Sequence, residues 1–148
     1  MADRGAPRAS GSRRRRRPHL LLALAYEREG RYPEALTALD ETDPEWRIAG
    51  AVAMRGRLYA RVGRVEDARR ALEYLKGELN TTVSPFQEAT IYVALGEHDR
   101  AVDLLERAVR DRAWLVQLLK VEPNFDPLRE QPRFRALLRK VGLVEADP

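Results

Sequence analysis

The chain has 148 residues, with 27 Lys and Arg against 23 Asp and Glu, and it contains no cysteine. This length corresponds to about one domain with room for a sizeable core. The lack of cysteine excludes disulfide bonds and thiolate metal sites, and no apolar run approaches the ~20 residues that span a bilayer. We therefore expect no membrane span and a cytoplasmic location.

Residues 1–18 differ in composition from the rest of the chain. They carry seven arginines against a single acid, Asp3, whereas the remaining residues include 20 basic and 22 acidic side chains. The segment is rich in Gly, Pro, Ser and Arg and has no large apolar residue after Met1. It cannot bury enough surface to offset its chain entropy, so we predict a disordered, Arg-rich tail.

The tail contains the consecutive arginines Arg13, Arg14, Arg15, Arg16 and Arg17. Three interpretations of this run are open. It is a solvated leader or linker, or it is an anion-binding arm for nucleic acid or an acidic membrane, because clustered arginines attract phosphates. The third interpretation is an export signal, with residues 20–26 as a short apolar region.

From residue 19 onward, a pattern with a period of 33 residues dominates the sequence. Small residues, tyrosines, glycines, alanines and leucines each return at this interval, three times over. The series are Ala23, Gly56, Ala89; Tyr26, Tyr59, Tyr92; Gly30, Gly63, Gly96; Ala35, Ala68, Ala101; and Leu39, Leu72, Leu105. A fixed period of this size indicates stacked supersecondary units, none of which buries its apolar face alone.

Each unit is predicted to be two helices joined by a tight turn. In the first unit, Gly30 ends the first helix, and Pro33 suits the first turn of the second. The first helix is expected to present an apolar stripe of Leu21, Leu22, Ala25 and Tyr26, and the second a stripe of Ala35, Leu36 and Leu39. Start signals precede the next two units, at Thr42-Asp43-Pro44-Glu45 and at Ser84-Pro85-Phe86-Gln87.

This pattern resembles the tetratricopeptide repeat, in which a small residue, a tyrosine, a glycine, an aromatic, an alanine and a large residue follow at fixed intervals. Val65 and His98 stand where an aromatic is usual, and the family's period is about 34. The resemblance implies an all-α fold: a right-handed α–α superhelix of three helix–turn–helix repeats with C-terminal capping helices. The repeats are expected at residues 19–43, 44–81 and 82–110.

Residues 111–148 are predicted to form a capping segment. Trp114, Leu115, Leu118 and Leu119 have helical spacing, and Phe134, Leu137, Leu138 and Val141 form a one-sided apolar stripe that ends at Gly142. Such a helix would cover the open face of the last repeat. The alternative is that Trp114, Phe125 and Phe134 line a pocket for a partner.

Residues 84–143 also resemble the closing segment of certain bacterial tetratricopeptide regulators. The resemblance is carried by the run Pro123-Asn124-Phe125-Asp126-Pro127-Leu128-Arg129 and by Pro132-Arg133-Phe134 with Leu137-Leu138. In those relatives a winged-helix, nucleotide-cyclase or protein-kinase domain precedes the segment. No such domain occurs in this sequence, so a detached C-terminal piece of a larger signalling regulator is one interpretation.

No catalytic pattern emerges from the sequence. His19 and His98 lack the spacing of a zinc site, and there is no nucleophile elbow, phosphate loop or dinucleotide fingerprint. We expect neither an enzyme nor a bound metal or cofactor.

The family resemblance also implies where a ligand would bind, because the first helix of each tetratricopeptide pair lines a concave groove. Carried over by register, the groove residues are Leu24, Glu27 and Arg28; Ala53, Arg57 and Arg61; and Phe86, Thr90 and Val93. Arg57 and Arg61 are four residues apart and share one helix face. They would grip an acidic side chain or a C-terminal carboxylate, with Phe86 as an apolar anchor. Alternatively, these arginines pair with local acids or face water.

The leading hypothesis is a non-catalytic protein-interaction module that holds a peptide or partner protein, including an acidic one, in this groove. The second is a regulatory or nucleic-acid-associated protein in which the arginine tail supplies the affinity. Self-association through exposed end helices is a further expectation.

Overall fold

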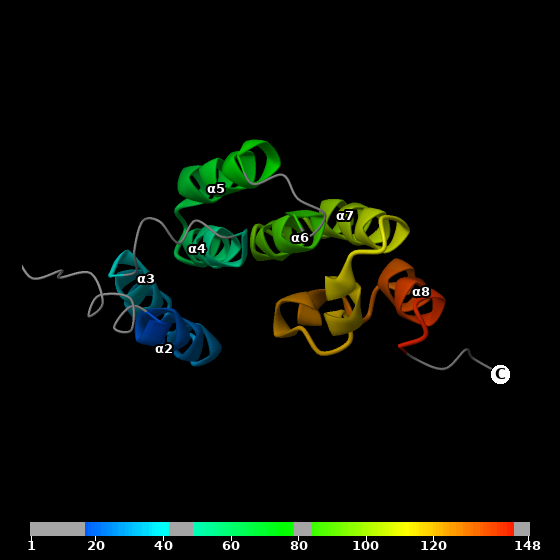
Figure 1. The fold of residues 1–148 in the computed structure, drawn as a ribbon, viewed down its shortest axis with the longest axis horizontal. Helices are drawn as coiled ribbons and strands as arrows, with labels where there is room; N and C mark the ends of the chain where they lie inside the picture. Colours follow the sequence, from blue (N-terminus) through cyan, green and yellow to red (C-terminus); the bar gives the residue numbers. More distant parts are fainter. Residues whose placement is uncertain (1–16, 42–48, 79–83, 144–148) are drawn as a thin grey trace, which may run out of the picture. The chain divides into compact units, whose positions relative to one another are not determined.

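The computed structural model describes residues 17–41, 49–78 and 84–143. They belong to two compact units, divided between residues 47 and 48. Every regular element in these ranges is a helix (Figure 1), so the predicted all-α fold is confirmed. The predicted start signal at Thr42-Asp43-Pro44-Glu45 lies outside the described residues.

The first unit contains one helix pair, α2 (Arg17–Arg28) and α3 (Tyr32–Asp40), which pack against each other. Helix α2 begins at Arg17, two residues before the predicted boundary of the tail. Residue 18 is a proline, which suits the first turn of a helix.

The predicted apolar stripe of α2 is wrong in part. Ala23 is fully buried, whereas Leu21 is 67% exposed and Ala25 is exposed. A helix turns by about 100° per residue, so Leu21 and Ala25 lie on the side of α2 opposite Ala23. The small residue of the repeat therefore marks the buried face of this helix, and the bulkier apolar residues beside it do not.

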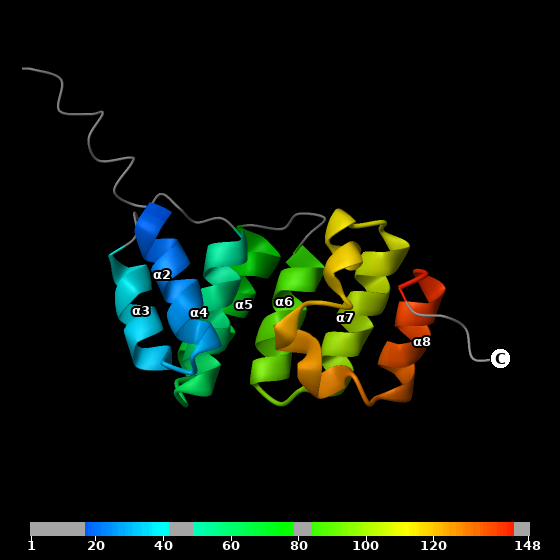
Figure 2. The same cartoon turned by 90° about the horizontal axis from the view of Figure 1, so that it is seen from below.

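The second unit contains two more pairs, α4 (Ala49–Arg61) with α5 (Val65–Gly77) and α6 (Ser84–Ala94) with α7 (His98–Arg110). Helix α6 packs against both α4 and α5, so the two pairs are stacked (Figures 1 and 2). The first helices of the two pairs, α4 and α6, thus lie side by side. This stacking is what the 33-residue period predicts.

The repeat glycines end α2, α4 and α6 in the same way. Gly30, Gly63 and Gly96 have φ values of 74°, 82° and 78°, a region that residues with a side chain resist. The amide of the following residue donates to the carbonyl of the repeat tyrosine, over 2.8 Å from Arg31 to Tyr26 in the first pair. The same bond recurs in the other two pairs, and the arrangement is a Schellman motif.

Gly56 has a different role, because it permits close packing of helices. A Cβ atom added to Gly56 would lie 2.5 Å from Cδ1 of Ile91 on α6 and 2.9 Å from Cβ of Ala71 on α5. Only a residue without a side chain fits at this distance. The contact explains why a glycine stands in the second repeat where Ala23 and Ala89 stand in the others.

The C-terminal segment consists of two 3-10 helices, η1 (Trp114–Leu118) and η2 (Pro123–Leu128), followed by α8 (Pro132–Lys140). The expected α-helix at residues 114–119 is replaced by η1. The ring of Pro123 disfavours the helical conformation at Glu122, which is extended with φ −71° and ψ 111°. Segment η2 packs on α6 and α7, and α8 packs on α7, which are the contacts expected of a cap.

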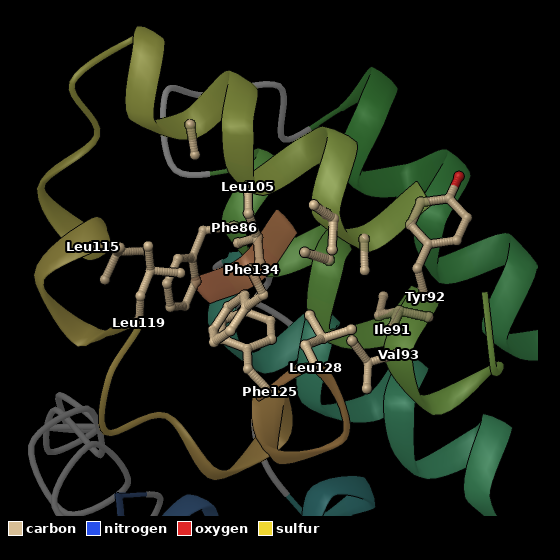
Figure 3. Close-up of a cluster of buried hydrophobic side chains, with 14 of the residues drawn as sticks. Phe86, Ile91, Tyr92, Val93, Leu105, Leu115, Leu119, Phe125, Leu128 and Phe134 are labelled. Atoms are coloured by element: carbon tan, nitrogen blue, oxygen red, sulfur yellow. The ribbon is translucent and has the colours of Figure 1, made fainter. Parts of the chain in front are cut away.

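Phe125 and Phe134 are fully buried, and they hold the cap to the last repeat (Figure 3). Their ring centroids lie 6.3 Å apart. The predicted stripe on α8 is confirmed for Phe134, Leu137 and Leu138, which are all buried. Gly142, with a φ of 74°, follows the helix as expected.

Candidate functional site

The residues predicted to line a groove all lie on the first helix of a pair. Leu24 lies three and four residues before Glu27 and Arg28, and the members of the other two sets follow at intervals of three or four residues. Each set therefore shares one face of α2, α4 or α6. The structure differs from the prediction in how accessible these faces are.

On α2, the predicted groove residues are partly accessible. Leu24 and Glu27 are half-buried and Arg28 is exposed. They belong to the first compact unit, whereas the other predicted groove residues belong to the second. Their expected place beside the α4 residues stays a prediction.

On α4, the two arginines that were predicted to line the groove differ in solvent exposure. Ala53 is fully buried, Arg57 is 6% exposed, and Arg61, one turn later, is exposed. Arg57 and Arg61 each have an interaction partner, so the alternative that they pair within the chain stays open. The small side chain of Ala53 adds no bulk to this face.

On α6, the predicted groove residues are buried. Phe86, Thr90 and Val93 are 3%, 3% and 5% exposed. The ring of Phe125 covers Phe86 edge-on, with centroids 5.1 Å apart and planes 79° apart (Figure 3). The Thr90 hydroxyl donates to the carbonyl of Gln87 within the same helix, over 2.7 Å.

The expectation that Phe86 is an exposed ligand anchor is therefore wrong. The chain's own η2 segment packs on α6 and occupies the apolar surface that a ligand was expected to use. Alignment to the repeat pattern of the family could not predict this coverage of α6, because the pattern contains no information about the segment that follows the last repeat.

The alternative role for the C-terminal aromatics is also wrong. Phe125 and Phe134 are buried in the core, whereas Trp114 is 70% exposed. The three side chains therefore do not line one pocket. Trp114 is a surface residue of η1.

Sequence reasoning also missed a polar pocket on another face of α6, which Glu88 lines. The available signal was a single acid in the otherwise uncharged sequence Ser84–Ala94. Among the described residues, no group of three His, Cys, Asp or Glu side chains is arranged to hold a metal ion.

Of the predicted anion-binding arginines, Arg13, Arg14, Arg15 and Arg16 lie outside the described residues, and Arg17 begins α2. No helix within the described ranges has the length and apolar character to cross a bilayer.

Comparison with protein families gives matches to models described as tetratricopeptide repeat. They cover residues 16–41, 49–73 and 89–113, which correspond to the three helix pairs. No curated protein and no solved structure matches the chain.

Proposed function

The chain belongs to the tetratricopeptide repeat family, and from this premise we propose that it is a non-catalytic protein-interaction module whose peptide-binding surface is centred on α4. Tetratricopeptide repeats indicate a protein–protein interaction module. More specifically, we propose that an acidic peptide binds to the face of α4 that carries Arg57 and Arg61.

The observation that carries the proposal is the pair Arg57 and Arg61 on one face of α4. Arg57 is recessed at 6% exposure and Arg61 is open to solvent. A guanidinium group presents several fixed donors, and it binds a carboxylate through two parallel hydrogen bonds. Leu24, Glu27 and Arg28 belong to the other compact unit, so the proposed surface does not include them.

On α6, the burial of Phe86, Thr90 and Val93 restricts the proposal. These residues are no longer proposed as direct ligand contacts. A bound peptide would lie along α4 and would not displace the ring of Phe125.

The proposal is tested by titrating the isotope-labelled full chain with peptides rich in Asp and Glu, with free or amidated C-termini, and following amide shifts by NMR. We expect saturable shifts at Arg57 and Arg61. Arg61→Glu should weaken binding at least about tenfold, which corresponds to the ~1.4 kcal/mol expected for loss of a charged hydrogen bond.

The matched control is Arg70→Glu, because the Arg70 side chain is 78% exposed on α5 and lies outside the proposed surface. It changes the net charge by the same amount. Equal weakening by both variants would indicate nonspecific charge attraction. Shifts confined to other helices would rule out the α4 surface.

A second candidate function rests on the run Arg13 to Arg17 in the sequence. Clustered arginines bind nucleic acid with an affinity that falls steeply with salt. Deletion of residues 1–16, which leaves α2 intact, should abolish retention on DNA or RNA. Unchanged retention after the deletion would exclude this function.

A further inference from the structure

A pocket of about 390 Å³ is formed by residues of α5, α6 and α7. It lies on a different face of α6 from the predicted groove. Because a helix turns by about 100° per residue, Glu88 points to the side of α6 opposite Phe86 and Thr90. The pocket is therefore separate from the α4 surface proposed above.

Glu88 is the recessed polar group of this pocket. It is only 6% exposed. Among the described residues, none donates a hydrogen bond to its carboxylate. Burial of an ionised carboxylate is costly, and this cost favours the protonated form of Glu88 or a ligand at its side.

Charged and titratable side chains from three helices face Glu88. They are Glu73 and Lys76 of α5, Tyr92 of α6, and Arg100, Asp103 and Arg107 of α7. Burial raises the pKa of Glu88, and Glu73 acts in the same direction. Lys76 and Arg107 oppose this rise without cancelling it.

Lys76 and Arg107 at the rim form only long ion pairs, and that of Lys76 is with Glu73 at 3.6 Å. Lys76 donates to the Tyr92 hydroxyl over 3.0 Å, and this contact raises the pKa of Lys76, which stays charged near neutral pH. Arg107 has its nearest acid, Asp111, at 3.7 Å. Such exposed, long ion pairs are weak and exchange readily.

The acids at the rim, Glu73 and Asp103, are fewer than the cations Lys76, Arg100 and Arg107, so they offset this positive charge only in part. Asp103 accepts a hydrogen bond from Arg133 of α8 over 2.6 Å, so the carboxylate of Asp103 already has a cationic partner outside the pocket. With Glu88 protonated, the pocket has an excess of positive charge. It therefore favours an anion over a cation.

We propose that this pocket binds an oxyanion of a partner, a carboxylate or a phosphate group, between Lys76 and Arg107, and that Glu88 controls its entry. Neutral Glu88 donates its hydroxyl hydrogen to the bound anion. Ionised Glu88 repels the anion. Binding consequently strengthens as the pH falls through the pKa of Glu88, and bound anion favours uptake of one proton.

The test uses two probes that stay ionised between pH 5 and 8: sulfate for the phosphate chemistry and trifluoroacetate for the carboxylate. The isotope-labelled full chain is titrated with each probe across this pH range at constant ionic strength set with chloride. We expect saturable amide shifts at Lys76, Glu88 and Arg107 that grow tighter toward low pH. The probe with the lower dissociation constant identifies the favoured source.

Three variants make the test specific. Glu88→Gln keeps the shape and removes the charge, so it should bind at least as tightly as the wild type at pH 5 and should lose the pH dependence. Arg107→Gln should weaken binding by roughly tenfold, the effect of losing one charged hydrogen bond. Arg110→Gln removes an exposed arginine from the same helix outside the pocket, and should change little.

The proposal is overturned if neither probe gives saturable shifts at the pocket, or if Arg110→Gln weakens binding as much as Arg107→Gln. It is also overturned if Glu88→Gln keeps the wild-type pH dependence, since a group other than Glu88 would then be responsible. A failure here leaves the α4 surface untouched, because that surface is tested with Arg61→Glu.

Discussion

The ring of Phe125 stands edge-on to the ring of Phe86, with centroids 5.1 Å apart. This contact is part of the packing of η2 on α6, the first helix of the last repeat. The face of α6 that carries Phe86 is consequently inaccessible, since the Phe86 side chain is only 3% exposed to solvent.

Phe125→Ala should destabilise the fold by about 3–5 kcal/mol, because a fully buried aromatic side chain is removed and a cavity remains. Chemical denaturation followed by circular dichroism measures the change. Trp114→Ala is the matched control, since Trp114 lies in the same segment and is 70% exposed. If the two variants lose equal stability, Phe125 does not anchor the cap.

Gly56→Ala should destabilise the second unit even though alanine is the better helix former by about 1 kcal/mol. The added Cβ would meet Cδ1 of Ile91 at 2.5 Å, and overpacking of this kind costs about 1–3 kcal/mol. Adding Ile91→Val removes the clashing atom and should recover part of the loss. Thermal unfolding of the single and double variants measures both effects.

The control for this comparison is Gly77→Ala, because nothing lies within 4 Å of a Cβ built there. This substitution should leave the stability unchanged or raise it. If Gly56→Ala behaves in the same way as Gly77→Ala, the close approach of α4 and α6 is not a constraint.

Arg112→Gly should stabilise the chain by about 1 kcal/mol. Arg112 ends α7 with a φ of 52°, in the left-handed region that costs a residue with a side chain about 1–2 kcal/mol. The following amide, of Ala113, donates to the carbonyl of Ala108 over 3.0 Å, which is the bond that follows the repeat glycines. The midpoint of urea unfolding should therefore rise.

Arg110→Gly places the same substitution two residues earlier, inside α7, where it should cost about 1 kcal/mol. A gain at position 110 or a loss at position 112 would contradict the assignment of Arg112 as the helix-ending residue.

Glu88→Gln should raise the free energy of unfolding at neutral pH. Burial raises the folded-state pKa of Glu88 above its unfolded value of about 4.3. The ionised form is therefore disfavoured in the folded chain. The wild type carries no penalty below the unfolded pKa, and the penalty grows until the pH passes the folded pKa.

The stability difference between Glu88→Gln and the wild type should accordingly widen from pH 4 upward and then level off. Each unit of pKa shift contributes about 1.4 kcal/mol. Denaturant unfolding in a pH series measures the difference without any ligand. A constant difference across the series would show that Glu88 titrates normally.

The sequence was sufficient to predict the helix pairs and the glycine turns that end their first helices. Gly30, Gly63 and Gly96 predicted the three Schellman turns, because positive φ is a local property of the backbone. The stripe of α8 and its end at Gly142 were likewise local patterns.

Properties that depend on neighbours were not predictable. Leu21 was expected to face the core because it is apolar, but its side of α2 lies opposite Ala23. Phe86 was expected to be open because the family register assigns it to a groove, but η2 covers it. Glu88 passed unnoticed, since only the packing of α5 and α7 shows that this acid is recessed.

The packing of Phe125 on Phe86 has a consequence for protein engineering. In a longer array, each added hairpin has to pack on the apolar surface of the repeat before it. Here, new hairpins joined downstream of α8 would meet the cap and not the apolar surface of the last repeat. Extension therefore requires excising residues 114–140 and splicing directly onto α7.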